Sequence, residues 1–172
     1  MTLFFLIGLI FIALILFFRT SLFYLVSENS RFVRSLQNAK WFQNVWLAGL
    51  FLFLINTILF GFTGLVLYIL TLFTFPYIHF IVMIFAVVVS ILFWMVVNKA
   101  CRENRLKIAA IGSSFYLLLT LIILYFYVNI EPFYPGEDTF MRALGLSLAM
   151  MVTFVAWISC FVITGLSNKT QV

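Results

Sequence analysis

The sequence predicts an all-α membrane protein, a polytopic bundle of five transmembrane helices. Three observations predict this class: 66% of the 172 residues are hydrophobic, only 9% are charged, and the mean hydropathy is +1.23. A soluble globular domain is about 45–50% apolar and about 25% charged. The apolar runs are continuous and lack the alternating polarity of membrane barrel strands. This composition excludes a disordered chain, a nucleic-acid-binding domain and an ordinary soluble enzyme.

Five apolar segments are the expected spans of one integral membrane domain that covers residues 1–172. They are residues 2–26, 47–72, 77–97, 108–130 and 144–166, each long enough to cross a bilayer. Within the first segment only Arg19 is charged, and its methylene stem lets the guanidinium reach the interface. A cleaved signal peptide is the alternative for this segment, which lacks the positively charged start and small-residue cleavage site of such peptides.

The polar segment 27–46 is expected to contain a short amphipathic helix that lies in the membrane interface. Wound as a helix from Ser30, it places four apolar residues in one stripe, although Gln43 falls inside that stripe and Trp41 falls opposite it, so the amphipathicity is moderate. The stripe comprises Phe32, Leu36, Ala39 and Trp46. Trp41 and Trp46 would then lie at the level of the lipid headgroups. An ordinary linker is the alternative.

The next connections are short enough to fix neighbouring helices. Only four residues separate the second and third spans, so these must form an antiparallel hairpin, with Pro76 at its turn. Residues 98–107 are hydrophilic and are expected to connect the third and fourth spans. Residues 131–142 form a loop with two prolines, one glycine and three acids before the fifth span.

The basic residues predict the orientation, because Lys and Arg concentrate in cytoplasmic loops. Those assigned to the cytoplasmic face are Arg31, Arg34, Lys40, Lys99, Arg102, Arg105 and Lys107. They follow the first and third spans, whereas the other two connections carry few basic residues. We therefore expect the N-terminus outside and the C-terminus in the cytosol, in the plasma membrane. The net charge of +5 is a topology signal and an attraction for anionic lipid headgroups; no nucleic-acid partner is expected.

Small residues spaced four apart let membrane helices approach closely. The candidates are Gly145, Ala149, Thr153, Ala156, Cys160 and Thr164 in the fifth span, and Thr57, Gly61 and Gly64 in the second. The first span offers only Gly8 and Ala13. We therefore expect spans two to five to form the core of the bundle, with the first span at its edge or on a partner.

Asn56 is the most informative polar residue inside a span, because it lies near the middle of a bilayer about 30 Å thick. An amide at that depth requires hydrogen-bond partners. Ser90, Thr120 and Thr153 are candidate partners by depth. Asn56 therefore either holds helices together or contributes to a ligand or ion site.

The outer face carries the remaining candidate contacts, His79, Glu131, Glu137 and Asp138. A single histidine and two distant cysteines are too few for a zinc site, and no cofactor is expected; haem shared with a partner subunit is the alternative. The acids form either a loose cation site, a contact for an external partner or a solvated turn.

The sequence predicts a non-catalytic accessory, assembly or regulatory component of a membrane complex, with a membrane-protein partner or further copies of itself. No catalytic motif is recognisable, and no Asp, Glu or Lys lies within a span. One alternative is a channel or transporter subunit that is complete only on oligomerisation, with Asn56, His79 and the serines of the fourth span around one cavity. The other is a lipid-active enzyme that uses Arg102, Glu103 and Arg105.

Overall fold

A computed structural model describes residues 30–73, 76–101, 104–132 and 138–166. These residues form five α-helices and one short 3-10 helix, with no strand among them. In chain order the elements are α3 (Arg31–Asn38), η1 (Lys40–Gln43), α4 (Val45–Thr71), α5 (Pro76–Ala100), α6 (Arg105–Val128) and α7 (Phe140–Gly165). Four of the helices, α4 to α7, are long and apolar enough to cross a membrane, which indicates a membrane protein.

These four helices confirm the second to fifth predicted spans, and each boundary lies within four residues of its expected position. A long apolar run predicts a helix reliably, because a segment that crosses lipid must satisfy its backbone hydrogen bonds within itself. The first predicted span, residues 2–26, lies outside the described residues, so the count of five spans stays a prediction.

The segment before α4 contains a helix, but not the expected continuous one. Its helix ends at Asn38, a 3-10 turn follows, and Trp46 belongs to α4. The expected stripe is therefore not formed by a single helix. Val33 is buried against the core, whereas Phe32 is 72% exposed, so α3 packs on the bundle through Val33. That α3 lies in a membrane interface stays a prediction.

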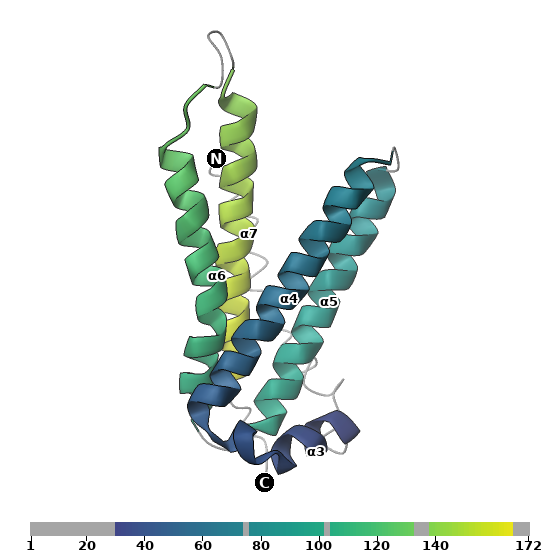
Figure 1. Cartoon of the computed structure of the whole chain (residues 1–172), viewed down its shortest axis with the longest axis vertical. Helices are drawn as coiled ribbons and strands as arrows, with labels where there is room; N and C mark the ends of the chain where they lie inside the picture. Colours follow the sequence, from purple (N-terminus) through teal and green to yellow (C-terminus); the bar gives the residue numbers. More distant parts are fainter. Residues whose placement is uncertain (1–29, 74–75, 102–103, 133–137, 167–172) are drawn as a thin grey trace.

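The spanning helices form two antiparallel hairpins, α4 with α5 and α6 with α7. The hairpins meet at the end of the molecule where α3 lies, and they diverge toward the opposite end (Figure 1). We call these the α3 end and the far end. The hydrophilic connection between the hairpins is shorter than expected, since α5 continues to Ala100 and α6 begins at Arg105. Asn104 makes this tight corner with a φ of 55°, a left-handed conformation that asparagine tolerates.

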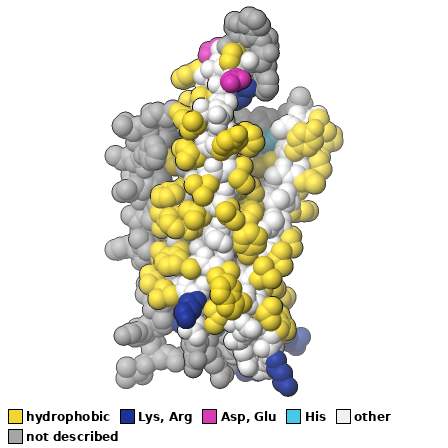
Figure 2. All heavy atoms as spheres, turned by 60° about the vertical axis from the view of Figure 1, so that its left-hand side comes forward, with side chains coloured by type: hydrophobic (Ala, Val, Ile, Leu, Met, Phe, Trp, Pro, Cys, Tyr) yellow, Lys and Arg dark blue, Asp and Glu magenta, His cyan; other side chains and the backbone are white. Residues whose placement is uncertain are grey.

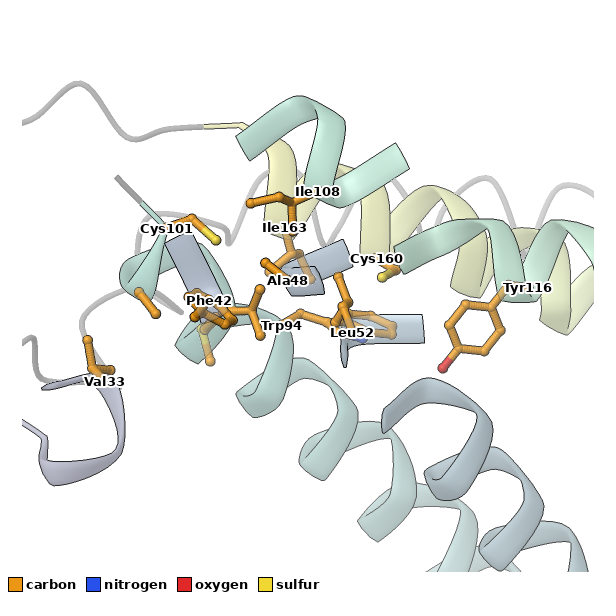
Figure 3. Close-up of a cluster of buried hydrophobic side chains, with 13 residues drawn as sticks. Val33, Phe42, Ala48, Leu52, Trp94, Cys101, Ile108, Tyr116, Cys160 and Ile163 are labelled. Atoms are coloured by element: carbon orange, nitrogen blue, oxygen red, sulfur yellow. The ribbon is translucent and has the colours of Figure 1, made fainter. Parts of the chain in front are cut away.

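The buried core occupies the α3 end alone. It is mostly hydrophobic: Val33, Phe42, Ala48, Leu52, Trp94, Met95, Val97, Ala100, Cys101, Ile108, Tyr116, Cys160 and Ile163. Figure 3 shows this cluster, with Val33 at one edge and Tyr116 at the other. Along α4 no described residue beyond Asn56 is buried, and along α5 none with a described side chain is buried before Trp94. The second hairpin follows the same pattern, since no described residue of α6 beyond Tyr116 and none of α7 before Thr153 is buried, so the far halves of both hairpins contribute exposed apolar surface.

Two glycines allow α4 and α6 to approach closely near the α3 end. A Cβ at Gly49 would lie 2.7 Å from the Cβ of Ile111, and one at Gly112 would overlap Leu52. Each helix thus places a bulky side chain over a glycine of the other, the packing expected in membranes.

The close-approach positions predicted from small-residue spacing are partly wrong. A Cβ at Gly61, Gly64 or Gly145 would meet no atom within 4 Å, so these glycines mark no contact. Thr153, Cys160 and Thr164 of the predicted ridge are buried. Spacing identifies a helix face, but the rotation of each helix about its axis decides which face meets a neighbour.

Candidate functional site

Asn56 forms the centre of a buried polar cluster that joins all four spanning helices. Its amide nitrogen donates to the carbonyl oxygen of Gly112 on α6 at 3.1 Å and to the sulfur of Cys160 on α7 at 3.6 Å. Its amide oxygen accepts a hydrogen bond from the indole nitrogen of Trp94 on α5 at 2.9 Å. We call Asn56, Trp94, Gly112 and Cys160 the Asn56 cluster.

The four members of the cluster lie in one layer of the bundle. Asn56 lies eleven residues after the start of α4, about 16 Å along the helix axis at about 1.5 Å per residue. Trp94, Gly112 and Cys160 lie five to seven residues from the ends of their helices at the α3 end. Gly112 has no side chain to shield its carbonyl, which helps Asn56 to reach a backbone oxygen that already belongs to a helix.

The hydrogen-bonding capacity of Asn56 is almost filled. An asparagine side chain offers two N–H donors and two acceptor sites on its oxygen. Both donors and one acceptor site are used, and the side chain is completely buried. An amide engaged in this way has no donor left for a ligand, so the chemistry of the cluster is that of a helix joint.

The polar residues predicted as partners of Asn56 are bonded to other groups. Thr120 donates to the hydroxyl of Thr153 at 2.9 Å, which ties α6 to α7. Ser90 is hydrogen-bonded to the side chain of Tyr116. These residues were predicted as partners of Asn56 because they lie at a similar depth in the membrane. In the structure they lie inside the same bundle but bond to other side chains.

Asn98 forms a second polar joint, between α5 and α7. Its side-chain nitrogen donates to the carbonyl oxygens of Thr164 at 2.7 Å and Leu166 at 3.2 Å. The last carbonyls of a helix lack partners within that helix. Asn98, which is buried, therefore caps α7 from a neighbouring helix.

Other hydroxyl groups in the spans bond to their own helices. Thr57 donates to Phe53, and Ser114 donates to Ile111. Exceptions include Ser159, whose hydroxyl is buried without a hydrogen-bond partner among the described residues. His79 is half-buried near the far end of α5, fifteen residues or about 22 Å from the level of Trp94. The structure therefore does not gather Asn56, His79 and the serines of α6 around one cavity.

The charged residues predicted at the two faces lie at opposite ends of the bundle. The described basic residues at the α3 end are Arg31, Arg34, Lys40, Lys99, Arg105 and Lys107. Glu131 and Asp138 lie at the far end with Arg142, which donates to the carbonyl of Glu131 at 2.7 Å. Figure 2 shows the acidic side chains at one end with basic charge beside them, further basic side chains at the opposite end, and a largely apolar surface between the two ends. Arg102, Glu103 and Glu137 lie outside the described residues.

The acids of the far end form no recognisable cation site in the described part of the chain, where no group of three or more His, Cys, Asp or Glu side chains could hold a metal ion. Asp138 instead accepts a hydrogen bond from the backbone N–H of Phe140 at 2.8 Å, at the start of α7.

Cys101 is buried at the α3 end. Burial raises the pKa of its thiol to about 12, although Arg105 opposes the shift. The thiolate is the reactive form of cysteine, so this side chain is a poor nucleophile in the folded protein. Its burial is also unfavourable for lipid modification of the thiol.

Sequence reasoning missed three residues of these joints. Nothing in the sequence distinguished Trp94 from the other three tryptophans. Asn98 was assigned to a connecting loop, and Gly49 was not included in a small-residue pattern. One available signal was the rarity of asparagine in apolar segments: a second asparagine at the end of a span marks a second joint.

Comparison of the chain with protein-family models, with curated proteins and with solved structures finds no match in any of the three. The geometry of the site therefore carries the functional argument.

Proposed function

We propose that the protein is a non-catalytic component of a membrane complex, an accessory, assembly or regulatory subunit that docks through its helix surface. The observation that carries the proposal is the arrangement of its polar and apolar groups. The side-chain amides of Asn56 and Asn98 spend their hydrogen bonds on contacts between helices, whereas the far halves of the hairpins expose apolar side chains.

The docking surface that we propose is the open part of the contact between α4 and α6. Four positions at the same spacing run along each helix: Gly49, Phe53, Phe60 and Gly64 on α4, and Ile111, Phe115, Ile122 and Phe126 on α6. We call these eight residues the α4–α6 seam. Spacings of 4, 11 and 15 residues keep side chains on one helix face.

The seam is closed only near the α3 end. There Gly49 faces Ile111, and the ring of Phe115 packs edge-on against Phe53 and Phe60 at centroid distances of 5.6 and 6.0 Å. Beyond Phe60, a Cβ at Gly64 would meet nothing within 4 Å, and Phe126 is 57% exposed. The combination of a glycine and bulky side chains suits the insertion of one apolar helix from a partner.

We further propose that the α3 end faces the cytosol, with the N-terminus outside, in the plasma membrane. The support is the concentration of described Lys and Arg side chains at the α3 end, since such residues are enriched on the cytoplasmic side. The same residues provide an attraction for anionic lipid headgroups.

Photocrosslinking in native membranes tests the docking proposal. A photoreactive phenylalanine analogue at position 126 places the probe in the open seam. The same analogue at Tyr125 is a matched control, because Tyr125 is also exposed but points about 100° away around the helix. We expect one discrete adduct from position 126 and a stoichiometric partner after purification in mild detergent. A monodisperse particle of this chain alone, with no adduct at position 126, would overturn the proposal.

A further inference from the structure

The α4–α6 seam repeats one pattern at its two ends. Near the α3 end Gly49 lies against Ile111, where a Cβ on the glycine would be only 2.7 Å from the Ile111 Cβ. Fifteen residues further along both helices, Gly64 of α4 again pairs in register with a bulky apolar residue of α6, Phe126. Because α4 and α6 run in the same direction from the α3 end (Figure 1), equal steps along both helices keep the pair level. This second pair is apart, since a Cβ at Gly64 would meet nothing within 4 Å.

The two hairpins are joined toward the α3 end only. Among the described residues, the hydrogen bonds between the hairpins reach no further than the level of the Asn56 cluster, where Ser90 of α5 is bonded to Tyr116 of α6. The last ring contacts between the hairpins in this part of the chain are those of Phe60 with Phe115 and Tyr116, at centroid distances of 6.0 and 6.4 Å. Beyond them the hairpins can turn relative to each other without breaking a described hydrogen bond at the far end.

We propose that the two hairpins close on each other about the Asn56 cluster, so that Phe126 packs over Gly64 as Ile111 packs over Gly49. The structure shows the open arrangement, and the closed one is in equilibrium with it. Gly64 lies eight residues beyond Asn56, about 12 Å along the helix axis, so a rotation of about 10° moves it by about 2 Å and the last turn of α4 by about 4 Å. Rotation of rigid elements about a fixed contact is a common form of closure.

Packing favours the closed arrangement. Helices in lipid associate through van der Waals contact, and small residues allow the close approach that this contact requires. Beyond Phe60 the seam consists of Gly64, Ile122 and Phe126, so closing it strands no polar side chain of the seam. Ile122 and Phe126, which are 52% and 57% exposed in the open arrangement, become buried between the hairpins.

Closure regulates the docking proposed for the same seam, and this role rests on that proposed function. A partner helix and the closed hairpins compete for the surface formed by Gly64 and Phe126, so only the open arrangement binds the partner. The apparent affinity for the partner then falls in proportion to the open fraction. A bound partner in turn holds the hairpins open, because it interacts with one of the two arrangements only.

Disulfide crosslinking in membranes tests closure. The background carries Cys101→Ser and Cys160→Ser, and Gly64→Cys is combined with Phe126→Cys. We expect oxidation to link this pair within one chain, which then takes up no polyethylene glycol maleimide after denaturation. Gly64→Cys with Tyr125→Cys is the matched control, because Tyr125 is 66% exposed at nearly the same height but points about 100° away, and roughly tenfold slower linkage is expected there.

Spin labels at Tyr68 and Val128, which are both exposed near the far end, measure closure with the seam residues intact. We expect two distances between the labels in bilayers and the loss of the shorter one in Gly64→Ile, whose side chain fills the space that Phe126 would occupy. Gly61→Ile is the matched control, since a Cβ at either glycine meets nothing in the open arrangement but Gly61 lies outside the seam, about 60° further round α4. It should leave both distances unchanged.

Three outcomes would overturn closure. One is the absence of linkage between Gly64→Cys and Phe126→Cys while Thr120→Cys links to Thr153→Cys, whose natural hydroxyls lie 2.9 Å apart within one hairpin. Another is equally fast linkage in the Tyr125→Cys control, the result of random collision. The third is a single spin-label distance that neither isoleucine substitution changes.

A photoreactive analogue at Ile122, inside the seam, separates closure from docking. In the chain linked between positions 64 and 126 we expect its adduct with the partner to be lost, and a reducing agent to restore it. An adduct that persists in the linked chain would overturn the regulatory role. Linkage without an adduct in either state would overturn docking and leave closure standing, whereas an adduct in a chain that never links would do the reverse.

Discussion

Replacing Asn56 with leucine tests the assignment of this residue as the main polar joint of the bundle. Leucine keeps a similar side-chain volume but removes the hydrogen bonds to Gly112 and Cys160 and the acceptor of the Trp94 indole. Hydrogen bonds between membrane helices are worth about 0.6 kcal/mol on average. Two such bonds contribute about 1.2 kcal/mol, and a stranded buried N–H costs a further 1–3 kcal/mol approximately.

We therefore expect Asn56→Leu to lower the free energy of unfolding by about 2–4 kcal/mol. The assay is equilibrium unfolding in mixed micelles, followed by circular dichroism as the mole fraction of denaturing detergent rises. Thr57→Val is the matched control, because the Thr57 hydroxyl donates only to Phe53 of its own helix at 2.9 Å. Its expected effect is below about 0.5 kcal/mol.

A double-mutant cycle with Trp94→Phe separates the joint from simple loss of packing. Phenylalanine removes the indole donor, so the second substitution should cost less once Asn56 is already leucine. We expect a coupling free energy of about 1 kcal/mol or more between the two sites. Additive effects, or an Asn56→Leu variant as stable as the natural chain, would refute the assignment of Asn56 as a joint.

The remaining predictions concern the glycine contact, the α7 cap and the buried thiol. Gly49→Ala should destabilise by about 1–3 kcal/mol, because its methyl group would crowd Ile111, whereas Gly64→Ala should be neutral or slightly stabilising, because its Cβ meets nothing; thermal unfolding in detergent measures both. Asn98→Ala should cost about 1–3 kcal/mol by removing the hydrogen bonds that its side chain donates to the carbonyls of Thr164 and Leu166, and should speed amide hydrogen exchange in the last turn of α7. Cys101 should react with iodoacetamide at pH 8 on the order of a thousandfold more slowly in the folded than in the unfolded chain, because burial raises its pKa to about 12. The raised pKa of Cys101 also makes the stability of the protein depend on pH. Above about pH 9 the unfolded chain releases the thiol proton and the folded chain keeps it, so the free energy of unfolding falls as pH rises.

Each of these predictions has a result that contradicts it. Equal effects of alanine at Gly49 and Gly64 would show that α4 and α6 do not meet through Gly49. Unchanged exchange at the end of α7 in Asn98→Ala would remove the capping role. Rapid labelling of Cys101 in the folded protein would place that thiol in contact with solvent.

The class of the protein and its long apolar helices could be predicted from the sequence, because a helix that crosses a membrane must satisfy its backbone hydrogen bonds within one long apolar run. The sequence also placed the charges at opposite ends of the bundle and identified Asn56 as a buried residue that needs partners. Composition and depth were sufficient for these conclusions, since neither depends on how the helices are rotated about their axes.

The partners of Asn56 were decided only by the tertiary structure. Its acceptors include a backbone carbonyl, which every residue possesses, and Gly112 supplies it only because Leu52 and Gly49 bring α4 and α6 together. Ser90, Thr120 and Thr153 have suitable depth but point to other neighbours. The rotation of α4 about its own axis likewise leaves Gly61 and Gly64 on open surface, away from any neighbouring helix. Depth follows from the position of a residue along one helix, whereas contact requires the relative rotation of two helices, which their packing alone fixes.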